Sequence, residues 1–240
     1  MAYNYLELVN AVNRKLNEVE LSSGNFATAK GWYAQCKDAI NASLRDINQS
    51  HFEWPFNHVS TEETLTAGTS RYAFPIDAGS VDFDSFRVKE DTTFNNKTTK
   101  LAVITYDDYL KHYVDQEYTT DTSIRNVPEK VCNAPSQEYI VVPPPKEAYK
   151  LVYEYYRIPV DLEKYDDVPF VPERYKHVVL DGAMYHSYMF RSNEQAATLA
   201  KAKFDEGIKR MRTVLINKYE YLTSTYIPQG AFFVAGPRLG

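Results

Sequence analysis

The spacing of apolar residues changes twice along the chain, and these changes limit the folds that it can adopt. Between Asn4 and Leu21, apolar residues recur every three or four positions, which is the period of one face of an α-helix. Between Asn57 and Pro159 they come in short β-branched and aromatic runs separated by turn residues. Helical spacing returns after Pro172. The pattern predicts an α+β protein, in which the N- and C-terminal segments form a helical bundle and a β-rich domain is inserted between them.

Turn residues and prolines set the expected limits of the helices. The Ser22–Asn25 loop breaks the first helical stripe. Pro55 forbids continuation of the second helix soon after its end, and Pro172 is a favourable first-turn residue for the third. The expected helices are Asn4–Leu21, Ala27–Ser50, Pro172–Arg191 and Glu194–Thr223.

The clearest strands of the inserted domain end at prolines. EYIVV is stopped by Pro143–Pro145, and AYKLVYEYYRI is stopped by Pro159. Both faces of the second strand carry apolar residues, which predicts that it is covered on both sides or completes an interface. Asp91–Lys100 is typical of an exposed hairpin or loop, LAVIT after it of a strand, and Tyr106–Tyr113 of a short helix.

These elements divide the chain into four parts: a first helical part (1–56), the inserted β-rich domain (57–169), a second helical part (170–225) and a C-terminal tail (226–240). The tail, YIPQGAFFVAGPRLG, holds two prolines, three glycines and no acidic residue, which favours an extended segment. An extended segment with aromatic and arginine side chains can anchor a partner. The expected anchors on a partner or neighbouring subunit are Tyr226, Phe232, Phe233 and Arg238.

The segment VPERYKHVVLDGAMYHSYMF at 171–190 sets two histidines among tyrosines, valines and methionines. His177 and His186 are nine positions apart, which places them on opposite faces of one helix, so they cannot share a metal ion. The adjacent small residues Gly182 and Ala183 favour a close contact between helices. We expect this helix to serve subunit packing through Tyr175, Val179, Gly182, Ala183 and Met189.

Motifs for catalysis and cofactor binding are missing from the sequence, which has neither a Gly-rich phosphate loop nor G-x-S-x-G. The adjacent acids Asp107–Asp108 and Asp166–Asp167 favour helix capping or a solvated loop over acid–base chemistry. Cys36 and Cys132 lie 96 positions apart and predict free thiols. We therefore expect no enzymatic activity, no metal site and no cofactor.

Two alternatives stay open at this point. The first is a ligand- or glycan-binding β module on a helical scaffold, with the aromatic residues of Tyr149–Tyr156 as its platform. The second is a hydrolase with a dispersed triad, whose base is His51, His58 or His112.

Composition favours assembly. The chain holds 20 tyrosines in 240 residues, and tyrosine suits interfaces because it joins a large apolar ring to a polar tip. A net charge of −5 argues against binding nucleic acid with the whole surface. No apolar run is long enough for a signal peptide or a membrane-spanning helix, so we expect synthesis inside the cell and no membrane partner.

The order of several segments resembles a known family. Together they resemble the head-to-tail adaptor proteins of tailed double-stranded DNA phages, also called tail tubular or connector adaptors, especially those of short-tailed phages. The resemblance covers nearly the whole chain. The segments that carry it are YLELVNAVNRKLNEVEL, AKGWYAQCKDAINASLRDINQSHFEWPFN, VDFDSFRV, ITYDDYLKHY, LVYEYYRIPVDL, VPFVPERYKHVVLDGAMYHSYMFR and KFDEGIKRMRTVLIN.

The resemblance implies a ring, typically of twelve copies, that docks beneath the portal protein of the virion and continues the DNA channel to the tail nozzle or tail tube protein. Double-stranded DNA would pass through without sequence-specific binding, and an acidic channel would let it slide. The resemblance also implies that the tail reaches the portal or a neighbouring subunit, and that the protein is made in the host cytoplasm.

Overall fold

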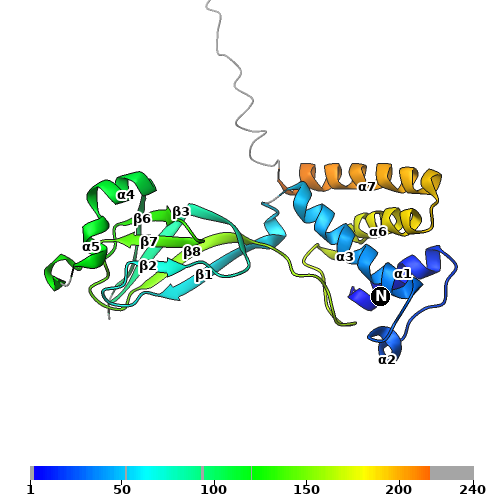
Figure 1. Ribbon diagram of the computed structural model, residues 1–240, viewed down its shortest axis with the longest axis horizontal. Coiled ribbons are helices and arrows are strands. Elements are labelled where there is room, and N and C mark those ends of the chain that lie inside the picture. Colours follow the sequence, from blue (N-terminus) through cyan, green and yellow to red (C-terminus); the bar gives the residue numbers. More distant parts are fainter. Residues whose placement is uncertain (1–2, 52, 93–94, 120, 217–240) are drawn as a thin grey trace, which may run out of the picture.

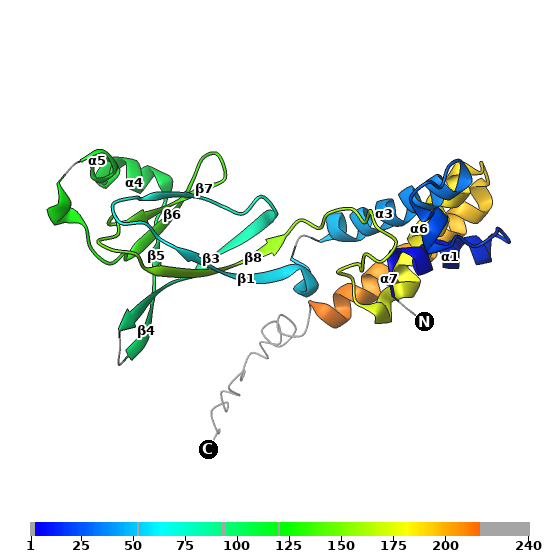
Figure 2. The same cartoon turned by 90° about the horizontal axis from the view of Figure 1, so that it is seen from below.

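The computed structural model describes residues 3–51, 53–92, 95–119 and 121–216, and it forms two lobes that lie end to end (Figure 1). One lobe is a helical bundle built from both ends of the chain, and the other is built from the strands of its middle. The chain crosses between the lobes once after the first long helix of the bundle and once after the last strand (Figure 2). The predicted α+β class, with a β-rich insertion in a helical bundle, is confirmed.

The bundle is layered around one central helix. α3 and α7 both pack against α6, and α1 packs against α3 and α6. Its core is apolar and closed to water, as the burial of Leu8, Ile40 and Phe204 shows. The helices of this lobe are α1 (Tyr5–Lys15), α2 (Ser23–Phe26), α3 (Trp32–Ser50), α6 (Lys176–Phe190) and α7 (Glu194–Leu215), and the short 3₁₀ turn η3 (Glu173–Tyr175) precedes α6.

Local polar contacts and glycine shorten two of the expected helices. α1 ends at Lys15 rather than Leu21, because the buried Asn10 side chain hydrogen-bonds the backbone N–H and C=O of Leu21 at 2.8 and 2.9 Å. α3 begins at Trp32 rather than Ala27, because Gly31 directly before it has a φ of 62°, which a helix does not accept.

The expected Ser22–Asn25 loop is wrong in part, since Ser23–Phe26 forms the single helical turn α2. Asn25 stabilises this turn by accepting a hydrogen bond from the Ser22 N–H at 2.7 Å. α7 is helical from Glu194 to Leu215, and the rest of the predicted helix up to Thr223 lies largely outside the described residues.

The second lobe is a β-sandwich of two four-stranded sheets, ordered β1-β8-β3-β4 and β2-β7-β6-β5. All neighbouring strands are antiparallel except β5 and β6. Residues of both sheets share one buried core, so the sheets pack face to face. The strands are β1 (His58–Thr64), β2 (Arg71–Ala73), β3 (Ala78–Thr92), β4 (Asn95–Lys100), β5 (Ala102–Val103), β6 (Lys130–Ala134), β7 (Glu138–Val142) and β8 (Lys150–Arg157).

Strand β8 buries one face only. Leu151, Tyr153 and Tyr155 lie in the sandwich core, whereas Val152, Glu154 and Tyr156 on the other face are partly exposed. Within the described chain the second face is therefore not covered, and the alternative expectation, that this face completes an interface, stays a prediction. The expected hairpin at 91–100 forms through the pairing of β3 with β4.

Two short helices cover the second sheet. α4 (Tyr106–His112) matches the predicted helix and is followed by α5 (Val114–Tyr118). Tyr109 of α4 is buried against Cys132 and Ile140 on the outer face of that sheet. The strand expected at 101–105 is reduced to the two residues of β5. Short 3₁₀ turns lie at Pro55–Asn57 (η1) and Thr122–Ile124 (η2).

Candidate interaction surfaces

The predicted tail anchors Tyr226, Phe232, Phe233 and Arg238 lie outside the described residues, and their role stays a prediction. The described chain ends at a defined place in the fold. Ile216 packs against the bundle core, and the end of α7 lies at the end of the bundle that faces the sandwich (Figures 1 and 2). The described chain therefore ends beside the junction of the two lobes.

Four of the residues expected to serve subunit packing are buried inside their own bundle. Tyr175, Val179 and Ala183 are at most 9% exposed. A Cβ atom at Gly182 would lie 2.3 Å from Ser43 Oγ, so this glycine permits the contact of α6 with α3. The predicted close helix contact is thus present within one chain, and contact of these residues with another subunit stays a prediction.

The fifth residue, Met189, is exposed in the last turn of α6 and precedes Phe190, which belongs to an exposed aromatic cluster. Met189 and its neighbour Phe190 are 52% and 55% exposed. The Phe190 ring lies 6.0 Å from the ring of Trp32, and the Arg191 guanidinium lies 3.9 Å above that same Trp32 ring. Aromatic and arginine side chains of this kind are frequent at protein interfaces.

The histidines do not form a metal site among the described residues. His186 lies 2.9 Å from Asp46 of α3, whereas His177 is exposed on another face of α6. His58 lies 3.0 Å from Glu154 on the neighbouring strand. No group of three His, Cys, Asp or Glu side chains that could hold a metal ion occurs in the described part of the chain.

The hydrolase alternative has no geometric support. Within the described residues, His51, His58 and His112 make no hydrogen bond to a Ser, Thr or Cys side chain. Cys36 and Cys132 are free, as predicted. Both are buried, and burial raises their pKa to about 12 and about 11. A thiol with such a raised pKa is protonated at neutral pH and is a poor nucleophile.

Of the two pairs of adjacent acids, Asp108 and Asp167 make structural contacts. Asp108 lies in the first turn of α4, but the side chain of Thr105 provides the N-cap by accepting a hydrogen bond from the Asp108 N–H at 3.2 Å. Asp167 accepts hydrogen bonds from the backbone N–H groups of Glu163 and Lys164, both at 2.7 Å. These bonds hold the pKa of the Asp167 carboxyl below its usual value.

The aromatic platform required by the glycan-binding alternative does not exist on the surface. Tyr149, Tyr153 and Tyr155 are at most 8% exposed and fill the sandwich core. Tyr156 is partly exposed, and the His58 ring stacks on it at 4.8 Å. One covered ring cannot offer the flat aromatic surface that this alternative predicted.

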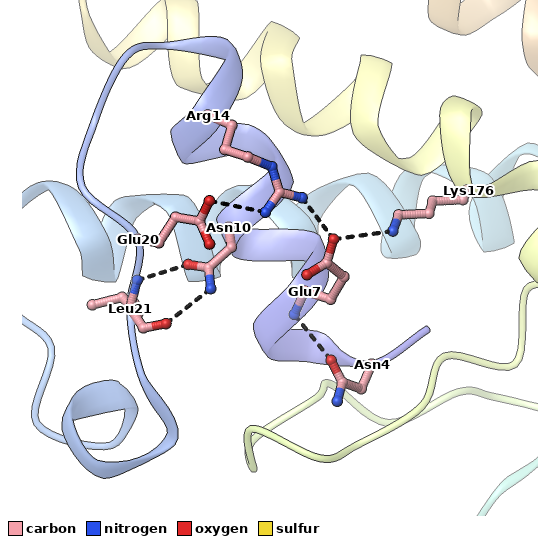
Figure 3. Close-up of polar contacts among 7 residues, drawn as sticks. All are labelled: Asn4, Glu7, Asn10, Arg14, Glu20, Leu21 and Lys176. Atoms are coloured by element: carbon pink, nitrogen blue, oxygen red, sulfur yellow. Dashed lines mark hydrogen bonds and ion pairs between the residues drawn. The ribbon is translucent and has the colours of Figure 1, made fainter. Parts of the chain in front are cut away.

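A polar network fixes α1 against α6 and against the loop after α1 (Figure 3). Glu7 Oε1 accepts a hydrogen bond from Arg14 at 2.6 Å and lies 3.7 Å from Lys176 Nζ of α6. Arg14 also donates to Glu20 in the loop at 3.1 Å. Asn4 caps α1 by accepting from the Glu7 N–H at 3.0 Å. The edge of the bundle formed by α1 is therefore held in place by charged contacts.

A groove of about 630 Å³ lies where the two lobes meet. Arg45 and Asn48 of α3 line its bundle side, and Tyr156 and Ile158 line its sandwich side. Arg45 Nε donates to Asp161 Oδ1 at 3.1 Å at one margin. The groove holds side chains that could contact an extended peptide and no cluster that suggests catalysis among the described residues.

No helix in the described part of the chain combines the length and the apolar character needed to cross a membrane.

Comparison with known protein families finds a match. A family model described as SU10 adaptor protein matches residues 3–224, which include the whole of both lobes. A search of curated proteins finds no match. The chain therefore belongs to the SU10 adaptor family, a family of phage structural adaptor proteins.

Proposed function

We propose that this member of the SU10 adaptor family forms a ring beneath the portal protein of a phage and joins the portal to the tail nozzle or tail tube protein. The observation that carries the proposal is the family match over residues 3–224, which covers the bundle and the sandwich together. The two lobes lie end to end, so one lobe can face each of two different partners. The ring holds twelve copies in this proposal.

The ring continues the channel through which double-stranded DNA enters and leaves the head. Its contribution is shape and charge, without sequence-specific binding, because the chain carries a net charge of −5 and DNA slides past a surface that repels its phosphates. The protein is no enzyme in this proposal. It is made in the host cytoplasm and works in the virion at the junction of head and tail.

The C-terminal tail captures the portal or a neighbouring subunit. The described chain ends at Ile216 beside the junction of the lobes, and the aromatic residues and Arg238 of the tail are of the types that dominate binding energy at interfaces. A segment that orders on binding can reach a partner beyond the folded lobes.

The test is the mass and shape of the purified chain, alone and mixed with its cognate portal ring, by light scattering and negative-stain imaging. We expect the 27.7 kDa chain to form a ring or to add a ring to the portal. Deletion of residues 226–240 should leave the circular dichroism spectrum unchanged and abolish portal binding. A chain that neither forms a ring nor binds the portal would contradict the proposal, and undiminished binding of the truncated chain would remove the tail from it.

A further inference from the structure

We infer that neighbouring copies of this chain contact each other through two different surfaces of the helical bundle. The loop at 158–170 of one copy, called here the acidic loop, packs against one flank of α7 in the next copy. The inference rests on the proposed ring and names the surfaces that close it.

The acidic loop exposes apolar side chains although its backbone is held firmly. Val160, Val168 and Tyr165 are 76%, 59% and 44% exposed. The carbonyls of Asp167 and Tyr165 accept hydrogen bonds from the first residues of α1 at 2.8 and 3.0 Å, and the Asn41 side chain of α3 bonds the backbone of the loop. An ordered segment that keeps several large apolar groups in water indicates a contact surface for another protein.

The loop also carries a strong negative charge. It contains four acidic residues and one lysine. Asp161 pairs with Arg45, and Asp167 binds the backbone of its own loop. Glu163 and Asp166 are exposed, and their side chains have no hydrogen bond or ion pair with any described residue. Two free carboxylates thus lie among the exposed apolar groups.

One flank of α7 carries exposed apolar and basic side chains, which complement the acidic loop. At 100° per residue, Leu199, Lys203, Arg210 and Val214 project from one side of the helix, about a quarter turn from its buried stripe. Leu199 and Val214 are 61% and 53% exposed. Lys203 has no ion pair among the described residues, and Arg210 pairs only with Glu206 in the same turn.

This flank borders a groove that can receive apolar side chains. The groove has a volume of about 340 Å³ and lies between α7, α6 and the end of α1. Leu199 and Tyr188 line it, and Lys203 adds a positive charge. Lys15 and Asp181 also line the groove and lie 3.8 Å apart, so their charges offset each other. Apolar groups beside the unpaired Lys203 match a loop that presents valine and tyrosine among carboxylates.

One copy cannot bring its own two surfaces together. The acidic loop rests on α1 and α3, whereas α7 packs on the opposite side of α6 (Figure 1). Contact therefore needs a second copy. Two different, complementary surfaces make a heterologous contact, which repeats around a ring when the rotation closes. Charge complementarity identifies the occupant of the groove as another copy of this chain.

Charge reversal tests the pairing. We expect the loop variant Glu163→Lys with Asp166→Lys, and the flank variant Lys203→Glu with Arg210→Glu, each to assemble at least about tenfold less well than the unmodified chain, because like charges then face each other. A 1:1 mixture of the two variants should restore assembly, since each copy then finds an opposite charge on both sides. Sedimentation velocity of the chain, alone and on the cognate portal ring, measures this.

A matched control reverses two charges on another side of the same helix. Lys209→Glu with Arg212→Glu changes the net charge by the same amount, but both side chains point away from the flank. This variant should assemble like the unmodified chain. Circular dichroism of every variant checks that the bundle is folded.

A cysteine pair gives a second readout. Val168→Cys with Leu199→Cys in one chain should yield disulfide-linked ladders longer than a dimer under oxidation, whereas either single variant should yield none. The native Cys36 and Cys132 are buried and stay out of the reaction.

The outcomes separate the inference from the proposed function. Rings that form normally from either charge variant, or a mixture that does not recover, would overturn the inference while the ring itself stands. Ladders that stop at dimers would indicate a two-fold contact and would also overturn it. If the unmodified chain forms no ring alone or on the portal, the proposed function fails, and the inference fails with it.

Discussion

The helices of the bundle approach each other closely at glycine residues of α6 and α7, whereas the sheets of the β-sandwich pack stacked aromatic rings between them. In the bundle, Gly182 lets α6 approach Ser43 of α3 and Phe204 of α7. In the sandwich, the rings of Phe86 and Tyr153 stack at 4.6 Å. The bundle should therefore fail when volume is added, and the sandwich should depend on its rings and on the partners of their hydroxyl groups.

The two lobes can be followed separately in solution. The chain has two tryptophans, Trp32 and Trp54, and both belong to the bundle. Tryptophan fluorescence thus reports unfolding of the bundle. Near-ultraviolet circular dichroism receives signal from aromatic residues of both lobes, so a transition seen there and not in tryptophan fluorescence reports the second lobe.

The largest expected effect follows from adding volume to the bundle at Gly182. A Cβ there would lie 2.3 Å from Ser43 Oγ and 2.7 Å from a ring carbon of Phe204, so Gly182→Val forces the three helices apart. Overpacking of this kind costs about 3 kcal/mol, and displacement of the Ser43 hydroxyl also weakens its 2.8 Å hydrogen bond to the Val179 carbonyl. Urea unfolding followed by tryptophan fluorescence measures the loss.

Gly24→Ala is the matched control for this prediction. The nearest atom to a Cβ at Gly24 is Ser22 Oγ at 3.9 Å, which is an ordinary contact. This change should alter the free energy of unfolding by less than about 1 kcal/mol. Equal losses at Gly182 and Gly24 would show that the bundle is not closely packed around α6.

The second prediction concerns the hydrogen bonds that turn the chain after α1. Asn10→Ala leaves the N–H and the C=O of Leu21 without their partner in a buried site, which should destabilise the bundle by about 2 kcal/mol. Glu20→Gln in the same loop removes only an exposed contact with Arg14 and should cost a few tenths of a kcal/mol at most. Similar losses for both variants would contradict the buried role of Asn10.

Periodicity predicted the helices and the strands, but the side-chain contacts that limit them could not be predicted in this way. The apolar stripes at both ends of the chain gave the bundle and its long helices. The end of α1 at Lys15 depends on the hydrogen bond of the Asn10 side chain to Leu21, 11 positions away, and no local sequence pattern predicts that contact. The start of α3 after Gly31 follows from a positive φ, which glycine permits but does not require.

The interaction surfaces were harder to predict than the fold. The abundance of tyrosine indicated interfaces between subunits, yet Tyr139 and Tyr153 serve the core of the sandwich. The acidic loop falls almost entirely within residues 57–169, the range predicted for the β-rich domain. Its place on the bundle comes from backbone hydrogen bonds to α1, which act between residues more than 150 positions apart and leave no side-chain pattern.

The third prediction compares two hydroxyl groups in the sandwich core. The Tyr139 hydroxyl donates to Glu63 at 2.6 Å, so Tyr139→Phe should cost about 1.5 kcal/mol. The Tyr153 hydroxyl is buried without a hydrogen bond to any described residue, so Tyr153→Phe should be neutral or slightly stabilising. Near-ultraviolet circular dichroism in urea measures both. A larger loss at Tyr153 than at Tyr139 would show that the stabilising hydrogen bond belongs to the Tyr153 hydroxyl and not to the Tyr139 hydroxyl.

The smallest expected effect is a pH-dependent one at the contact of α5 with β2. Arg71 donates to both carboxylate oxygens of Glu117, at 3.0 and 3.1 Å, and these bonds lower the pKa of Glu117. A lowered pKa adds stability that is present above the unfolded value of about 4.3 and is lost as pH falls through the folded value. Glu117→Gln should therefore destabilise the sandwich by about 1 kcal/mol at pH 7, and the difference from the unmodified chain should shrink below about pH 4.

Glu138→Gln, which removes a single 3.2 Å contact with Arg71, should have the weaker effect at pH 7. Urea unfolding at both pH values measures the difference, and a difference that does not change with pH would show that no charged pair holds α5 to the sheet.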